Sequence, residues 1–83
     1  MRVRYFAWVR ERVGHAEEEI DIPPGVETVG DLMGWLAQRD EGYGAAFAQP
    51  HVIRAALDHT HVQHDAALSQ GREVAFFPPM TGG

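Results

Sequence analysis

Residues 28–39 carry the strongest structural signal in the chain, because their apolar side chains recur at intervals of three and four residues. This spacing places them on one face of an amphipathic helix. The apolar residues are Val29, Leu32, Met33 and Leu36. Thr28 precedes them and predicts the helix N-cap, with Asp31 in the first turn. Since one apolar face must pack against another element, we expect a layered domain around this helix.

The segments around this helix alternate between apolar and polar residues, as half-buried strands do. We expect strands at residues 2–8, 17–22, 51–57, near Val62, and at 73–77. In the first strand, Val3, Tyr5 and Ala7 should point to one side of the sheet, and Arg2, Arg4 and Phe6 to the other. In the last strand, Val74 and Phe76 should face the core, and Ala75 and Phe77 the opposite side.

The remaining segments predict shorter elements. Residues 9–14 favour a turn of helix that ends at Gly14, and residues 40–50 a loop or short helix that ends at Pro50. Residues 58–60 predict a turn, and residues 65–71 a loop in which Leu68 packs inward.

The order of elements is therefore strand, strand, helix, strand, short strand, strand. One main helix on one face of a mixed sheet is an α+β arrangement, and the two terminal strands can lie side by side in such a sheet. This is the plan of a ubiquitin-like β-grasp fold. We expect residues 1–77 to form the β-grasp domain and residues 78–83 an extended, flexible C-terminal tail.

Composition excludes several classes of function. The 83 residues suffice for one domain. The net charge of −5 argues against a nucleic-acid or anionic-membrane surface. Without cysteine there is no disulfide, thiolate metal site or cysteine nucleophile. No stretch has the apolar length of a membrane span or the pattern of a signal peptide, so we expect a cytoplasmic protein.

Two charged or polar clusters in the domain are candidates for chemistry. His59, His61 and His64 form an H-x-H-x-x-H pattern, and imidazole is a good zinc or nickel ligand. Their spacing crosses a predicted turn and no carboxylate or cysteine stands at ligand spacing, so we expect a solvated surface and no tight metal site. Glu17, Glu18 and Glu19 are expected to form a solvated hairpin face.

The tail is the remaining candidate. Pro78 and Pro79 cannot donate to a sheet and stiffen the exit from the last strand. Six residues reach about 20 Å at full extension. Gly82 and Gly83 have no side chains, so this end fits a narrow passage. A frayed terminus is the simpler interpretation. The alternative is that the Gly83 carboxylate is the working group, activated by another enzyme as an acyl-adenylate and then converted to a thiocarboxylate.

The segments "FAWVRERVG" and "REVAFFPPMTGG" resemble the MoaD family, the small sulfur carrier subunits of molybdopterin synthase, and the resemblance covers the whole chain. It implies a β-grasp fold and a cytoplasmic heterotetramer with two copies of each subunit. The family usually has asparagine where this chain has Asp58, and both residues suit turns. Met80 replaces a more usual valine and keeps its apolar character.

By this resemblance, an E1-like enzyme uses ATP to adenylate Gly83, and a sulfur donor protein supplies the thiocarboxylate. The tail residues then insert into the large subunit, and the sulfur goes to cyclic pyranopterin monophosphate in molybdenum cofactor biosynthesis. The insertion residues are Pro78, Pro79, Met80, Thr81 and Gly82. Phe77 and Ala75 are expected at the partner interface. The chain binds no cofactor of its own and is not catalytic alone.

Other functions share this fold and ending. One is a sulfur carrier for another pathway, such as thiamine synthesis. Another is a ubiquitin-like modifier whose Gly83 forms isopeptide bonds with other proteins. A third is an interaction module with an inert tail.

Overall fold

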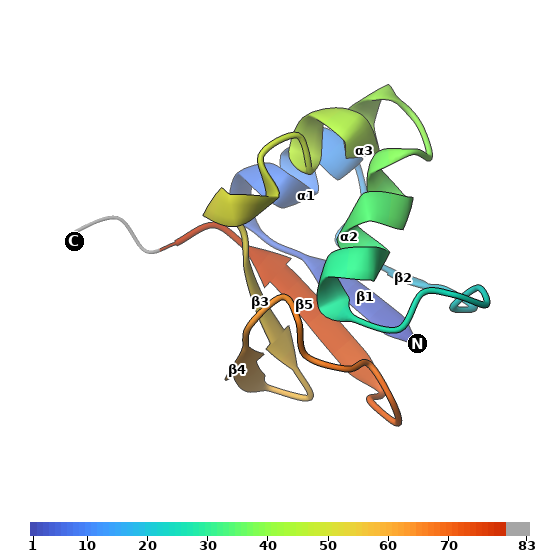
Figure 1. Ribbon diagram of the computed structural model, residues 1–83. Coiled ribbons are helices and arrows are strands. Elements are labelled where there is room, and N and C mark those ends of the chain that lie inside the picture. Colours follow the sequence, from blue (N-terminus) through green and yellow to red (C-terminus); the bar gives the residue numbers. More distant parts are fainter. Residues whose placement is uncertain (80–83) are drawn as a thin grey trace.

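The computed structural model describes residues 1–79 (Figure 1). They form five strands, three α-helices and a 3₁₀ helix. In chain order these are β1 (Arg2–Tyr5), α1 (Ala7–Val13), β2 (Glu17–Glu19), α2 (Val29–Ala37), α3 (Glu41–Ala46), η1 (Pro50–Val52), β3 (Arg54–Leu57), β4 (Thr60–Val62) and β5 (Glu73–Phe77). Met80, Thr81, Gly82 and Gly83 lie outside the described residues.

The strands form one mixed sheet in the order β2-β1-β5-β3-β4. The two terminal strands lie side by side, as predicted, and β1 and β5 are parallel with Val3 opposite Val74. The other neighbours pair antiparallel. The α-helices lie over one face of the sheet, and β5 ends at the edge of the molecule (Figure 1). This arrangement confirms the predicted ubiquitin-like β-grasp fold.

The main helix is close to its predicted position. Thr28 is its N-cap: the hydroxyl accepts a hydrogen bond from the Asp31 amide, and the Asp31 carboxylate accepts one from the Thr28 amide, which together form a capping box. The helix ends at Ala37, two residues before the predicted end. Its four apolar residues are all buried, so its sequence pattern identified the core-facing side correctly.

The core lies between the helices and the inner face of the sheet. Val74 and Phe76 are fully buried there, and their alternation in β5 is as predicted. The Phe76 ring is stacked on Tyr5, with 6.4 Å between centroids, and meets Phe47 edge-on at 5.2 Å. Leu68 is also buried, as expected of its loop. Phe76 thus anchors the last strand before the tail begins.

Three predicted strands are shorter in the structure. The first ends at Tyr5, because the chain turns into α1 at Ala7, whose φ is 52°; Ala7 is exposed and does not face the core. The second ends at Glu19, because its partner strand β1 begins at Arg2, the residue opposite Glu19. The third begins only at Arg54, because η1 occupies the residues before it.

Asp58 holds the start of β5 through the turn between β3 and β4. Asp58 and His59 both have positive φ, 47° and 69°, which is the pattern of a type I′ hairpin turn. The Asp58 Oδ1 accepts hydrogen bonds from the amides of Arg72 and Glu73 at 2.9 and 3.0 Å. These two bonds hold the pKa of Asp58 below its ordinary value, and the bond from the Arg72 amide has the larger effect. The carboxylate therefore fixes the position at which β5 begins.

Glu18 corrects the expectation of a fully solvated hairpin face. Glu17 and Glu19 are exposed and pair with Arg2, but Glu18 points toward the helices because it lies opposite Val3. It accepts hydrogen bonds from the hydroxyls of Tyr5 and Tyr43 and from the Arg39 guanidinium. Burial raises the pKa of Glu18, but these bonds together lower it more, and the net pKa lies below its ordinary value. Burial and then the bond to Glu18 raise the pKa of Tyr43 to about 12.

Replacing Glu18 by glutamine should therefore destabilise the domain at neutral pH. Losing the charge-assisted bonds should cost about 1–2 kcal/mol, and the melting temperature should fall by about 5–15 °C. Because the folded-state pKa of Glu18 is depressed, its contribution is present above the unfolded pKa and is lost as pH falls through the folded value. The variant should consequently lose less stability than the parent between neutral and acidic pH.

Thermal unfolding of both proteins across this pH range measures the effect. Glu17→Gln is the matched control, because it removes one charge from an exposed ion pair on the same strand and should change the free energy of unfolding by less than about 1 kcal/mol. Two results would contradict this role of Glu18. One is an equal loss of stability in Glu18→Gln and Glu17→Gln, and the other is the same decrease in stability with falling pH in Glu18→Gln and the parent.

Candidate functional site

The base of the tail lies at the end of β5, the central strand. Phe77 is the last strand residue, Pro78 is half-buried and Pro79 is exposed. Because proline has no N–H, neither residue extends the ladder as a donor. The strand thus ends where the prolines were expected to end it. The rest of the predicted insertion segment (Met80, Thr81 and Gly82) and Gly83 lie outside the described residues.

Phe77 and Ala75 lie on the face of the sheet that the helices leave open. They alternate with the buried Val74 and Phe76, and both are half-buried. Ala75 stands between Arg4 and Ala56 in register. The Phe77 ring contacts His61 edge-on, with 5.3 Å between ring centroids. Their predicted orientation is confirmed, whereas their role at a partner interface stays a prediction.

Phe6 is a third apolar residue at this end of the sheet. Tyr5 pairs with Phe76 in the parallel ladder, so Phe6 is next in register to Phe77. Its amide donates to the Phe76 carbonyl at 3.1 Å, and its side chain is 39% exposed, the only large apolar side chain so exposed among residues 1–79. Alternation in the sequence predicts that Phe6 lies on the side opposite to Val3 and Tyr5, but only the pairing of β1 with β5 brings Phe6 next to Phe77. We call Phe6, Ala75 and Phe77 the tail-base patch.

Arginine side chains flank the tail-base patch. The Arg4 guanidinium carbon lies 5.1 Å from the centre of the Phe6 ring, and Arg4 also lies 3.7 Å from carboxylate oxygens of Glu17 and Glu73. Arg54 lies opposite Phe77 in the β3–β5 ladder and is exposed. An apolar centre with charged residues around it is the usual anatomy of a protein–protein interface.

The three histidines of the H-x-H-x-x-H pattern are directed to different places. His59 lies in the turn, 3.9 Å from a Glu73 carboxylate oxygen, and His61 packs on Phe77. His64 Nε2 is hydrogen-bonded to the Ile53 carbonyl at 2.8 Å. Within residues 1–79, no three histidine, cysteine, aspartate or glutamate side chains group in a way that could hold a metal ion.

We therefore expect zinc to bind the chain only weakly, because the three imidazoles do not share one coordination sphere. Calorimetric titration of the purified chain with zinc should give a Kd weaker than about 10⁻⁶ M. The triple variant His59→Gln/His61→Gln/His64→Gln is the control for nonspecific binding. Stoichiometric, tighter binding by the parent that this variant loses would contradict the prediction.

None of the helices in the described part of the chain has the length and apolar character needed to span a membrane.

Known proteins resemble this chain in sequence and in fold. The chain is 39% identical to the molybdopterin synthase sulfur carrier subunit of Escherichia coli strain K12, with 100% of this chain and 99% of that protein covered. It is 30% identical to the subunit of the same name from Haemophilus influenzae, with the same coverage. In structure it is similar to SAMP1 from Haloferax volcanii, with a TM-score of 0.71, 26% identity, and coverage of 100% of this chain and 98% of that one. The sequence model of the ThiS family matches residues 3–83, and the chain therefore belongs to the ThiS family.

Proposed function

We propose that this protein is the sulfur carrier subunit of molybdopterin synthase. The observation that carries the proposal is the similarity to sulfur carrier subunits of that enzyme, which covers the whole of this chain. The chain itself ends in Gly82-Gly83. In this role a thiocarboxylate on Gly83 donates sulfur to cyclic pyranopterin monophosphate during molybdenum cofactor biosynthesis. The chain carries the reacting group and is not catalytic alone.

The chemistry begins with activation of the carboxylate. A C-terminal carboxylate is ionised at neutral pH and is a poor electrophile. In the proposed first step, an E1-like enzyme lets a carboxylate oxygen of Gly83 attack the α-phosphorus of ATP, and pyrophosphate leaves. Sulfur supplied at the sulfide level by a donor protein then attacks the acyl carbon, and AMP leaves. The chain needs no bound cofactor for these steps.

The described residues support the second half of this proposal, the docking of the carrier on its partner. An exposed Phe6 beside Phe77 gives the large subunit an apolar surface at the point where the chain leaves the sheet. Pro78 and Pro79 direct the chain away from the ladder. In the proposed complex, the residues after them enter the large subunit, and the glycines allow passage through a narrow channel.

Reconstitution tests the proposal. The purified chain is incubated with the E1-like enzyme, ATP and a sulfur source, and its intact mass is measured. We expect replacement of one oxygen by one sulfur. Adding the large subunit and cyclic pyranopterin monophosphate should then return the carboxylate form and give product that fluoresces after oxidation. A loaded chain that gives no product would favour a carrier for another pathway.

A ubiquitin-like modifier would share the fold and the Gly-Gly ending, so the same experiment needs a second readout. A denaturing gel of the native cell extract, probed for this chain, separates the two functions. A carrier should run as a single small species, whereas a modifier should give a ladder of covalent conjugates. Such a ladder without sulfur loading would overturn the proposed function.

A further inference from the structure

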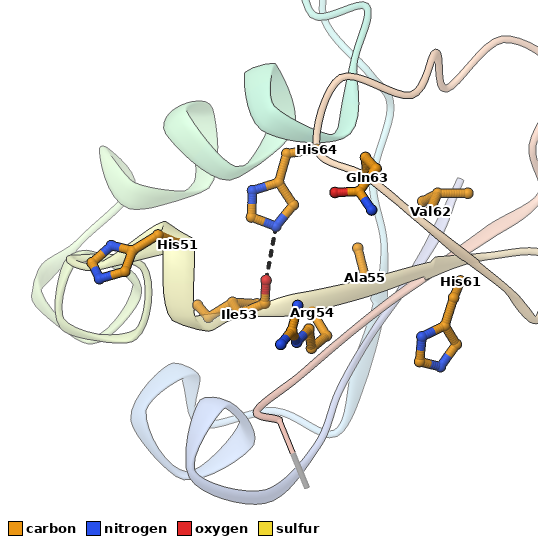
Figure 2. A pocket seen from close by; sticks show the side chains of 8 residues that line it. All are labelled: His51, Ile53, Arg54, Ala55, His61, Val62, Gln63 and His64. Carbon is orange, nitrogen blue, oxygen red and sulfur yellow. Dashed lines mark hydrogen bonds between the residues drawn. The ribbon is translucent and has the colours of Figure 1, made fainter.

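A cavity of about 370 Å³ opens at the edge of the sheet formed by β3 and β4 (Figure 2). Five of its eight lining residues are polar, and none of the eight is acidic. The polar residues are His51, Arg54, His61, Gln63 and His64. They come from η1, β3, β4 and the segment after β4. We call this cavity the β3–β4 pocket.

The charge of the β3–β4 pocket is opposite to that of the whole chain. The chain has a net charge of −5, with 12 acidic against seven basic residues. Arg2, Arg4 and Arg39 each pair with glutamates. Among residues 1–79, Arg54 has no carboxylate within ion-pair distance, and the same holds for Arg10, Arg12 and Arg72. An exposed guanidinium beside imidazole N–H donors, with no acid in the lining, is complementary to an anion.

The arrangement of the side chains favours an anion over a metal ion. His64 points from above β3 onto the Ile53 carbonyl, whereas Arg54 and His61 lie on the other side of this strand (Figure 2). The imidazoles therefore cannot converge on one cation, and a guanidinium repels one. Arg54 and His61 are both exposed and can donate hydrogen bonds to an incoming oxygen.

The β3–β4 pocket is continuous with the tail-base patch. The His61 ring packs edge-on against the Phe77 ring, with 5.3 Å between the ring centroids, and Arg54 is the residue opposite Phe77 in the neighbouring strand. A partner that covers Phe77 must therefore come close to both donors. Since the pocket adjoins a surface expected to bind protein, its anion is best supplied by that same protein.

We propose that the β3–β4 pocket receives a carboxylate side chain from an acidic segment of the large subunit that covers the tail-base patch. This inference rests on the proposed function. Arg54 donates to the carboxylate with the fork geometry that suits two oxygens, and His61 donates from the adjacent strand. The tail-base patch then supplies apolar contact, and the pocket fixes the orientation of the carrier on its partner.

Calorimetric binding to the purified large subunit tests this inference. Arg54→Gln should weaken the Kd at least about tenfold, and Arg54→Gln/His61→Gln further, because a charge-assisted bond is lost. Raising NaCl from about 50 to about 300 mM should weaken the parent more than the double variant. Arg54→Lys keeps the charge but not the fork, and should lie between the parent and Arg54→Gln.

Arg72→Gln is the matched control. It removes the same charge from an exposed residue that precedes the other end of β5, and it should change the Kd by less than about twofold. All variants should keep the parental melting temperature, because Arg54 and His61 are exposed.

The outcomes separate the two proposals. If the parent does not bind the large subunit, the proposed function fails. If the parent binds but Arg54→Gln behaves like Arg72→Gln, the pocket inference is wrong and the proposed function stands. If inorganic phosphate saturates the β3–β4 pocket of the isolated chain, and Arg54→Gln leaves the subunit affinity unchanged, the pocket is a small-anion site and the inference is also wrong.

Discussion

A chain extended by one alanine after Gly83 should accept no sulfur. The added residue converts the Gly83 carboxylate into an amide, which cannot attack the α-phosphorus of ATP. The new terminal carboxylate lies one residue further along the chain and should not fit the active site of the activating enzyme. Deleting Gly83 should have the same effect, because it draws the carboxylate back by one residue, about 3.5 Å. Both changes should abolish thiocarboxylate formation and, with it, product formation.

Neither change should alter folding, since the sheet ends at Phe77, six residues before the altered end. The measurement is intact mass after incubation with the E1-like enzyme, ATP and the sulfur source, followed by the product assay with the large subunit. Gln70→Ala, in the exposed loop before β5, is the matched control and should load normally. Normal product from the extended chain, with its alanine confirmed by mass, would remove the Gly83 carboxylate from the mechanism.

The fold was predictable because its elements have clear local signals. The one-face spacing after Thr28 gave the main helix and its cap, and the alternation in residues 73–77 assigned Phe76 to the core and Phe77 to the open face. Strand ends were less predictable. The left-handed turn at Ala7 and the 3₁₀ helix after Gln49 interrupt segments whose alternation continues in the sequence.

What the sequence missed depends on pairing between distant segments. Glu18 looked solvated because its neighbours are acidic, yet its place opposite Val3 turns it toward Tyr5 and Tyr43. Phe6 lies next to Phe77 only because β1 and β5 pair in parallel, and these strands are distant in the sequence. The β3–β4 pocket likewise joins η1, β3 and β4, and no local pattern relates His51 to His61.

Phe77→Glu should remove most of the affinity for the large subunit while leaving the domain folded. Phe77 lies on the open face at the base of the tail, beside Phe6, where a partner that takes up the tail must approach. A central aromatic residue of an interface contributes about 2–4 kcal/mol, so the Kd should weaken at least about thirtyfold. Phe77→Ser should have the same effect. It is included because a glutamate at position 77 could form an ion pair with Arg54, whereas a serine cannot.

Substitution of Phe76, the core-facing neighbour of Phe77, serves as the comparison. Phe76 is fully buried against Tyr5 and Phe47, so Phe76→Ala should lower the free energy of unfolding by about 3–5 kcal/mol. Phe77→Leu keeps an apolar side chain and should retain most of the binding. Melting temperatures and calorimetric affinities of the four variants together decide the assignment. If Phe77→Ser unfolds as readily as Phe76→Ala, Phe77 is part of the core; if both Phe77→Ser and Phe77→Glu fold and bind normally, the partner lies elsewhere. Phe76 and Phe77 are adjacent in one strand and have the same side chain, but they lie on opposite faces of the sheet. Loss of binding without loss of stability in the Phe77 variants would therefore show that the open face binds the large subunit.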